Sequence, residues 1–302
     1  MGKKVLITGG TGLVGSHLIP MLQSAGHEVV VLSRSKDPSK PFPIFEWDYE
    51  KEYIENGAFE GVDTVIHLAG AGVAEKKWTA ERKDEIYNSR TKTSFLLYQT
   101  LKEVPNEVKT FISASAIGYY GLDTGSINLK ESAPVGHDFL ARVVDAWETS
   151  TSKITELDIR LVQLRIGVVL SLKGGALVEL LKPPVAAPLG KGNQYMSWIH
   201  IEDLCRMFMF AMETESLKGA YNAVGPRPAT NKELTREAAS TLGKTFVPVP
   251  VPGLILKLIL GEMARMVIGG NRVSCERLLE AGFEFKHPKL SAAIAHLKST
   301  NQ

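Results

Sequence analysis

The stretch GGTGLVG, residues 9–15, decides the fold of this chain. It follows the short apolar run KVLIT and opens an apolar pattern with helical spacing over residues 13–25. Gly9 allows a tight turn, Gly12 lets the backbone approach a phosphate without an intervening Cβ, and Gly15 lets the helix pack closely on the strand. A phosphate here lies at a helix N-terminus, where unpaired N–H groups and the helix dipole favour an anion. The stretch predicts a dinucleotide-binding turn; the alternative is a purely structural turn.

Strand and helix patterns alternate through the first half of the chain. We expect strands at residues 4–8, 28–33, 44–47, 62–68, 110–115 and 160–170, and helices at residues 13–25, 79–102 and 138–152. The strands are nearly continuous apolar runs, which is typical of a parallel sheet that helices cover on both faces. We therefore predict an α/β fold.

The alternation ends near residue 171, where Gly, Pro and Lys cluster in LKGGALVELLKPPVAAPLGKGNQ. Helical patterns dominate the rest of the chain. We predict a nucleotide-binding domain at residues 1–170, to which residues 198–214 return, and a smaller substrate-binding lobe at residues 171–302.

The composition indicates a globular protein without a strongly charged partner. The chain has 302 residues, of which 44% are apolar and 23% are charged, and its net charge is +2. So small a charge predicts neither nucleic acid nor an anionic membrane as a partner. The most apolar segment, residues 249–270, is interrupted by Lys257, Glu262 and Arg265, so we expect a buried or interface helix there and no membrane span.

The amino terminus and the cysteines indicate the compartment. The first apolar run is too short for a signal peptide, so we expect a cytoplasmic protein. Cys205 and Cys275 are far apart in sequence, and we expect both to be reduced core thiols. No metal-binding spacing is present, and no metal site is predicted.

The end of the second expected strand indicates which dinucleotide binds. An NAD site usually carries an acidic residue there for the ribose 2′-hydroxyl, but this strand ends in Ser33 and Arg34. A guanidinium group suits a 2′-phosphate, with which it pairs in bidentate fashion. We therefore predict NADP as the cofactor; the alternative is that Arg34 is a solvated surface residue.

Further positions complete the predicted cofactor site. Besides the three glycines, it contains Leu13, Val14, Ser33, Arg34, Asp48, Leu68, Ala69, Gly70, Ser89 and Arg90. Asp48 either accepts a hydrogen bond from the adenine amino group or is a surface acid. The small residues that end the fourth expected strand let the cofactor cross the sheet edge. Ser89 and Arg90 either contact cofactor or substrate, or belong to an ordinary helix face.

The stretch SASAIGYYG, residues 113–121, ends the fifth expected strand with hydroxyl groups and glycines. It forms either one edge of an active site or a strand cap followed by a turn. A tyrosine serves as a general acid only where its surroundings lower its pKa, which is about 10 in reference peptides. Arg165 is either an interior ion-pair partner or a phosphate contact. Glu148 is expected to be structural.

Several segments occur in the order typical of a known superfamily. GGTGLVG, HLAGAGV, SASAIGYYG, RIGVVL and WIHIEDL resemble the extended short-chain dehydrogenase/reductases. Residues 249–273, with EAGFEF and HPKL, resemble the atypical, epimerase-family members that end in a short domain of unknown role. The resemblance covers essentially the whole chain. It implies a Rossmann-type doubly wound sheet, NADP binding and a substrate cleft between the sheet and a smaller C-terminal lobe.

Chemistry in that superfamily rests on a Ser, a Tyr and a Lys, with the Tyr and the Lys one helical turn apart. The resemblance places Ser115 at the Ser position, and Leu140 and Val144 at the Tyr and Lys positions. Neither Leu nor Val transfers a proton. The acid/base role therefore falls to Tyr119 or Tyr120, or it is absent.

Two functions stay open on this basis. The first is an NADP-dependent oxidoreductase, similar to epimerases and dehydratases, that acts on a small polar substrate such as a nucleotide sugar with Ser115, Tyr119 and Tyr120 as catalytic residues. The second is an NADP(H)-binding redox sensor or ligand-binding module without turnover. We favour the enzyme, as a monomer or homodimer whose partner is a small-molecule substrate.

Overall fold

The central feature of the molecule is an eight-stranded sheet. The computed structural model describes residues 2–300. Across the sheet, the strands are β12 (Gly219–Ala223), β8 (Arg160–Ile166), β6 (Thr110–Ala116), β5 (Thr64–His67), β1 (Lys4–Thr8), β2 (Glu28–Ser33), β3 (Ile44–Asp48) and β4 (Tyr53–Ile54). All neighbours are parallel except β3 and β4. The predicted α/β class is confirmed.

The strand order reverses between β1 and β5. From β1 the chain builds outward through β2 and β3 on one side, and from β5 it builds through β6 and β8 on the other. This is the doubly wound, Rossmann-type order that the resemblance implied. In such sheets ligands bind at the carboxyl ends of the strands where the order reverses, which is where the glycine stretch leaves β1.

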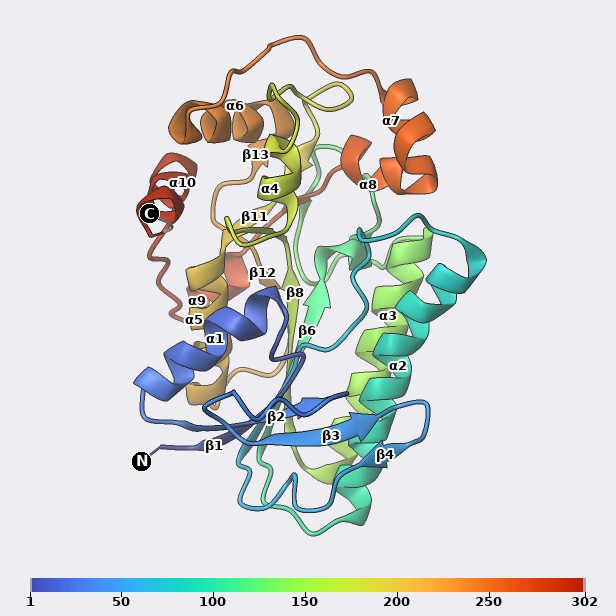
Figure 1. Ribbon diagram of the computed structural model, residues 1–302, viewed down its shortest axis with the longest axis vertical. Coiled ribbons are helices and arrows are strands. Elements are labelled where there is room, and N and C mark those ends of the chain that lie inside the picture. Colours follow the sequence, from blue (N-terminus) through green and yellow to red (C-terminus); the bar gives the residue numbers. More distant parts are fainter. Residues whose placement is uncertain (1, 301–302) are drawn as a thin grey trace.

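Helices cover both faces of the sheet, as the continuous apolar strands predicted. Helices α1 (Leu13–Ser24) and α5 (Ile201–Glu213) lie on one face, and α2 (Ala80–Glu103) and α3 (Phe139–Ser152) lie on the other (Figure 1). Alternate residues of β1 divide between them: Val5 and Ile7 join the core beneath α1 and α5, whereas Leu6 joins the core beneath α2.

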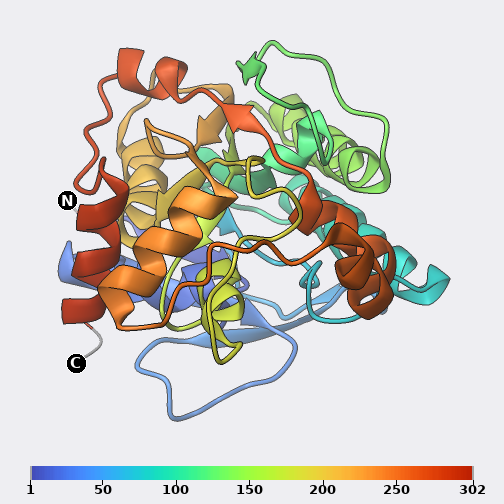
Figure 2. The same ribbon diagram turned by 90° about the horizontal axis from the view of Figure 1, so that it is seen from above.

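The C-terminal lobe lies above the carboxyl ends of β6 and β8 (Figures 1 and 2). Its helices are α4 (Ala176–Leu181), α6 (Asn231–Leu242), α7 (Gly253–Leu260), α8 (Ala264–Ile268), α9 (Glu276–Glu280) and α10 (Leu290–Ser299). Its short strand pairs are β10 (Tyr195–Met196) with β13 (Ala229–Thr230), and β14 (Arg272–Val273) with β7 (Asn128–Leu129). Single 3₁₀ turns occur at η1 (Ile117–Tyr120), η2 (Lys153–Leu157) and η3 (Gly261–Met263).

Two boundaries differ from the sequence expectation. The expected strand at residues 160–170 is two strands, because the chain leaves the main sheet at Gly167 and β9 (Val168–Leu170) pairs with β11 (Trp198–His200). Strand β12 belongs to the main sheet, although its residues lie beyond 198–214, the only segment expected to return there. The backbone of β12 pairs with that of β8 along all of β12, and the β12 residues Tyr221 and Ala223 are buried.

Two other expectations concern a membrane-spanning helix and the cysteines. Among residues 2–300, no helix combines the length and the apolar character needed to cross a bilayer. Cys205 and Cys275 are both free and buried, as predicted for reduced core thiols.

The glycine stretch brings α1 into backbone contact with the end of β1. Gly9 has φ +70°, a conformation that favours glycine, and a Cβ there would lie 2.9 Å from the Ala69 nitrogen. A Cβ at Gly15 would lie 2.6 Å from both the Gly10 Cα and the Gly9 carbonyl oxygen. Backbone atoms cannot move aside as a flexible side chain can, so the close approach requires glycine.

We predict that Gly15→Ala lowers the free energy of unfolding by about 2 kcal/mol or more, since the added methyl overpacks a rigid contact. Gly118→Ala is the matched control, because a Cβ there makes only ordinary contacts at 3.7 Å. Urea unfolding measures both. Equal stability of the two variants would contradict the close-approach argument.

Candidate functional site

The glycine turn lies beside the turn that follows β5. The Thr8 hydroxyl oxygen accepts hydrogen bonds from the backbone N–H groups of Leu68, at 3.2 Å, and Ala69, at 3.1 Å. Thr8 ends β1, so these bonds join the ends of the two strands between which the sheet order reverses. The structure thus brings together two groups of residues predicted to bind the cofactor, those of the glycine turn and those at the end of β5.

The N-terminus of α1 is chemically suited to an anion. Gly12 is its N-cap and supplies no capping side chain, and no acidic residue lies in its first turn. By contrast, a side chain caps α2, α3, α5 and α6. The first N–H groups of α1 therefore remain available to a phosphate, beside a cradle that a Cβ at Gly9 or Gly15 would fill.

Helix α2 contacts the turn that follows β5 through Ser89 and Arg90. The Ser89 hydroxyl oxygen accepts the Ala71 N–H at 3.0 Å, and Arg90 Nη1 donates to the Ala71 carbonyl at 3.0 Å. The Arg90 guanidinium also lies 5.1 Å from the Trp147 ring centroid. Burial lowers the pKa of Arg90 to about 10, which leaves it cationic at neutral pH. Both residues shape the turn after β5, and a contact with cofactor stays a prediction.

The adenine-side residues lie on neighbouring strands. Ser33 ends β2, Arg34 follows it and is exposed, and Asp48 ends β3, which pairs with β2. Asp48 already accepts the Glu50 N–H at 2.9 Å and pairs with Lys51 at 3.2 Å. The Lys51 hydrogen bond and the backbone N–H lower the pKa of Asp48. Asp48 therefore closes its own turn, and its predicted adenine contact remains untested.

A buried ion pair lies behind Ser115. Arg165 of β8 contacts Glu148 of α3 through two parallel hydrogen bonds, Nε to Oε1 and Nη2 to Oε2, each 2.8 Å long. The two residues are 4% and 9% exposed, so the pair is removed from water. Burial alone lowers the pKa of Arg165, but Glu148 raises it above its ordinary value. Of the two roles left open for Arg165, the structure shows the interior ion pair.

Ser115 and Tyr120 are both bonded into this pair. The Ser115 hydroxyl donates to Glu148 Oε1 at 2.6 Å. The Tyr120 hydroxyl accepts from Arg165 Nη1 at 3.0 Å and donates to Asn222 Oδ1 at 2.7 Å. Burial raises the pKa of Tyr120, although the Arg165 charge opposes the shift. The protons of both hydroxyls therefore point into the protein interior.

Tyr119 differs from its neighbour. It is half-buried, and its ring centroid lies 3.5 Å from the Arg165 Cζ, a cation–π contact that fixes the ring. The two tyrosine rings meet edge to face at 5.5 Å. Thus hydrogen bonds fix the hydroxyl of Tyr120, whereas Tyr119 is held through the face of its ring.

Apolar side chains occupy the positions of α3 at which the resemblance predicts the superfamily's Tyr and Lys. Leu140 and Val144 are buried, and both lie 3.7 Å from the Cβ position of Gly118 in η1. Helix α3 contains neither tyrosine nor lysine. This face of α3 therefore packs against the turn after β6.

The C-terminal lobe holds the same turn from the other side, through a residue that the sequence did not single out. Asn271 Nδ2 donates to the Gly121 carbonyl at 2.6 Å, and its Oδ1 accepts from the Thr124 N–H at 3.1 Å and hydroxyl at 2.9 Å. A GGN tripeptide predicts only a turn, so the sequence carries no signal for this contact.

A polar cavity of about 500 Å³ lies next to this turn. Arg142 of α3, Lys83 of α2, and Glu262 and Arg265 of the lobe line it, together with Asp138, the N-cap of α3. Lys83 pairs with Glu262 at 2.6 Å, which joins the lobe to the sheet domain at the cavity wall.

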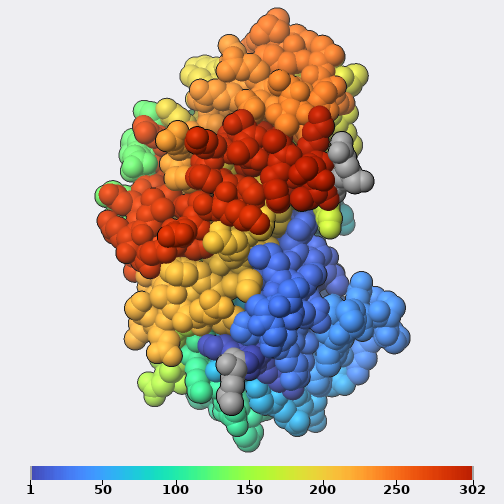
Figure 3. All heavy atoms as spheres, turned by 90° about the vertical axis from the view of Figure 1, so that its left-hand side faces the viewer, coloured from blue at the N-terminus to red at the C-terminus, as the bar shows by residue number. Residues whose placement is uncertain are grey.

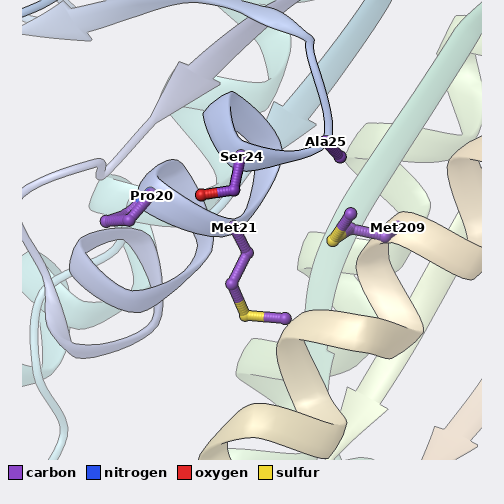
Figure 4. A pocket seen from close by; sticks show the side chains of 5 residues that line it. All are labelled: Pro20, Met21, Ser24, Ala25 and Met209. Atoms are coloured by element: carbon purple, nitrogen blue, oxygen red, sulfur yellow. The ribbon is translucent and has the colours of Figure 1, made fainter.

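A second hollow is less suited to chemistry. It measures about 420 Å³ and lies between α1 and α5, where Met21 and Met209 face each other beside Pro20, Ser24 and Ala25 (Figure 4). None of these side chains titrates, and the C-terminal end of α1 lies away from the strand ends that hold the glycine turn. The polar cavity is the better candidate for substrate.

Removing one partner of the buried pair should leave an uncompensated charge. We predict that Glu148→Gln lowers the free energy of unfolding by about 3–5 kcal/mol. Glu179→Gln, which breaks the exposed pair with Lys182, should change it by less than about 1 kcal/mol. Urea unfolding compares the two variants. A cost for Glu148→Gln no larger than the control's would contradict this account.

Comparisons with known proteins identify the family. The family model described as the NAD dependent epimerase/dehydratase family matches residues 5–139, and a domain of unknown function, DUF1731, matches residues 251–297. The Arabidopsis thaliana protein named epimerase family protein SDR39U1 homolog, chloroplastic, is 35% identical over 302 residues, which cover 96% of this chain and 85% of that one.

Two solved structures resemble the whole chain. Human epimerase family protein SDR39U1 (isoform 2), crystallised with NADPH, is 29% identical with a TM-score of 0.89, and the match covers 98% of this chain and 99% of that one. A nucleoside-diphosphate sugar epimerase from Corynebacterium glutamicum is 32% identical with a TM-score of 0.81, over 98% of this chain and 58% of that one. This chain therefore belongs to the NAD-dependent epimerase/dehydratase family.

Proposed function

We propose that this protein binds NADP(H) at the carboxyl edge of its sheet and uses it in an oxidoreduction of a small polar substrate. The observation that carries the proposal is the uncapped N-terminus of α1 beside the Gly9 and Gly15 cradle, with Arg34 at the end of the next strand. The human relative crystallised with NADPH supports the choice of cofactor.

The residues present fit this cofactor. The N–H groups that open α1 bind the pyrophosphate, and the glycines let the backbone approach it. Arg34 is exposed and binds the 2′-phosphate, which an acidic side chain would repel. The small residues after β5 let the cofactor pass toward Ser115. When bound, the nicotinamide supplies or accepts a hydride.

A nucleotide sugar is the substrate class that the polar cavity suits. Arg142 and Arg265 line it, and cations of this kind bind the oxygens of a diphosphate. The cavity lies between the sheet domain and the lobe, where the resemblance placed the substrate cleft. The Corynebacterium glutamicum structure named as a nucleoside-diphosphate sugar epimerase supports this class.

Tyr119 is the residue that we assign to proton transfer. Tyr120 lines the polar cavity and Tyr119 does not, but Tyr120 is 4% exposed and donates its own proton to Asn222, so it is the weaker of the two predicted acids. Tyr119 is half-buried, and Arg165 holds its ring in place. Ser115 keeps its oxygen lone pairs for a substrate hydroxyl, because its proton is already donated to Glu148.

A second function is favoured by a separate observation. The Ser115 proton is bound inside the protein, and apolar residues pack where the superfamily carries its Tyr and Lys. Both features suit a module that binds NADP(H) and senses redox state or carries a ligand without turnover. The cytoplasmic location and the monomeric or homodimeric state remain predictions.

The cofactor assignment predicts that NADPH binds more tightly than NADH and that Arg34→Ala weakens NADPH binding about tenfold or more, because a charged hydrogen-bond pair is lost. NADH affinity should not change. Lys109→Ala, which removes an exposed cation at the opposite edge of the sheet, is the matched control. Calorimetric titration with each cofactor measures these affinities, and equal dissociation constants in the intact protein would refute the assignment.

A measurement of turnover distinguishes the enzyme from the binding module. If the enzyme assignment is right, some carbonyl or sugar-nucleotide substrate is converted, which a net oxidation or reduction shows in the nicotinamide absorbance and an epimerisation shows as a new sugar product. Tyr119→Phe should slow that conversion about 100-fold or more without altering NADPH affinity. Tyr87→Phe, on the exposed face of α2, is the control. Tight NADPH binding with no turnover, and no effect of Ser115→Ala on any ligand affinity, would establish the binding module instead.

A further inference from the structure

Three histidines and a glutamate meet far from the glycine turn. His200 ends β11 and caps α5, Glu202 lies in the first turn of α5, His287 lies in the loop before α10, and His296 lies in α10. One ligand atom from each lies within 4.8 Å of all the others. Figure 3 shows the face on which the C-terminal segment crosses α5, red over gold.

The spacing of these atoms suits a transition-metal ion. His287 Nε2 lies 2.8 Å and His296 Nε2 lies 3.8 Å from Glu202 Oε2, and His200 Nε2 lies 3.3 Å from His296 Nδ1. Ligands at about 2.0–2.1 Å from a tetrahedral ion lie about 3.4 Å from one another. The Glu202–His287 and Glu202–His296 separations lie on either side of this value, so these atoms accommodate an ion with shifts of about half an ångström.

Hydrogen bonds decide which residues are free to be ligands. His200 Nδ1 accepts the Glu202 backbone N–H at 3.0 Å, so a neutral His200 carries its proton on Nε2 and has no lone pair for a metal. Its Nε2 instead lies 3.3 Å from His296 Nδ1. Glu202 Oε1 accepts from Lys286, and Oε2 lies 2.8 Å from His287 Nε2, a contact that an ion between these two atoms replaces once His287 carries its proton on Nδ1.

The histidine-bearing loop is held in position without a metal. Asp203, which is fully buried, accepts the backbone N–H groups of Lys286 and His287, each at 2.8 Å. The rings of His200 and His287 stack with centroids 3.9 Å apart, and those of His287 and His296 lie 4.3 Å apart. Such support orients ligands before an ion arrives and lowers the ordering cost of binding.

We propose that Glu202, His287 and His296 bind one divalent transition-metal ion, of which Zn²⁺ is the type, in a two-histidine, one-carboxylate site. A fourth position stays open to water or an anion. Nitrogen and carboxylate ligands in this number are those that Zn²⁺ takes. The ion ties α5, which packs on the sheet, to the last helix of the C-terminal lobe.

The sequence did not predict this site because its ligands come from distant segments. Glu202 and His287 are 85 residues apart, and no short spacing pattern links them. Only the crossing of α10 and its preceding loop over α5 brings the ligands together.

The test uses the full chain without a histidine tag, stripped with a chelator and titrated with Zn²⁺ alone against a colorimetric chelator. We expect one ion per chain. His287→Gln and His296→Gln should each weaken binding at least tenfold, since even outer-shell losses cost about 10–100-fold. His137→Gln, an exposed histidine outside the cluster, should leave binding unchanged. Co²⁺ should give visible absorption bands in the intact protein that both ligand variants lose.

Each variant's melting temperature without metal shows whether it folds, and His296→Gln, with its half-exposed ring, is the variant expected to stay closest to the intact protein. A Zn²⁺-dependent rise in melting temperature should occur in the intact protein and in His137→Gln alone. Zn²⁺ binding that is absent, or that both ligand variants keep, would overturn the proposal and leave the cluster as a hydrogen-bond network.

Discussion

The buried ion pair between Glu148 and Arg165 is the interaction on which the candidate active site depends. Removing two charges from water costs several kcal/mol per ion, and only good geometry with further hydrogen bonds offsets that cost. Here both carboxylate oxygens of Glu148 accept hydrogen bonds from the Arg165 guanidinium. Ser115 donates a further hydrogen bond to Glu148, and Tyr120 accepts one from Arg165. The pair therefore links α3, β8, β6 and η1 in one network, and the direction of each hydroxyl proton follows from it.

The turn after β6 is held between this network and the C-terminal lobe. Asn271 binds Gly121 and Thr124 from the lobe side, while Leu140 and Val144 pack against Gly118 from α3. A turn fixed on both sides can present Tyr119 in one orientation. This gives the short C-terminal domain a physical role, because without it the carbonyl of Gly121 loses a buried partner.

Sequence reasoning succeeded where chemistry is local. The glycine spacing predicted a phosphate turn, and the structure places these glycines where the sheet order reverses, beside Leu68 and Ala69. It was less complete where contacts join distant segments. It left Arg165 with two roles, which the bidentate contact with Glu148 resolved, and it did not anticipate β12 in the sheet, Asn271 or the histidine cluster.

The sequence by itself determined the α/β class and the glycine turn after the first strand, and it predicted that Leu140 and Val144 replace the superfamily's Tyr and Lys. These features depend on residue period, on the absence of a Cβ and on residue identity, all of which neighbouring residues express. The tertiary structure alone decided that the Ser115 and Tyr120 protons face inward and that Glu202, His287 and His296 converge. Hydrogen-bond direction and ligand geometry depend on distances of a few ångströms between residues far apart in the chain, and only packing sets those distances.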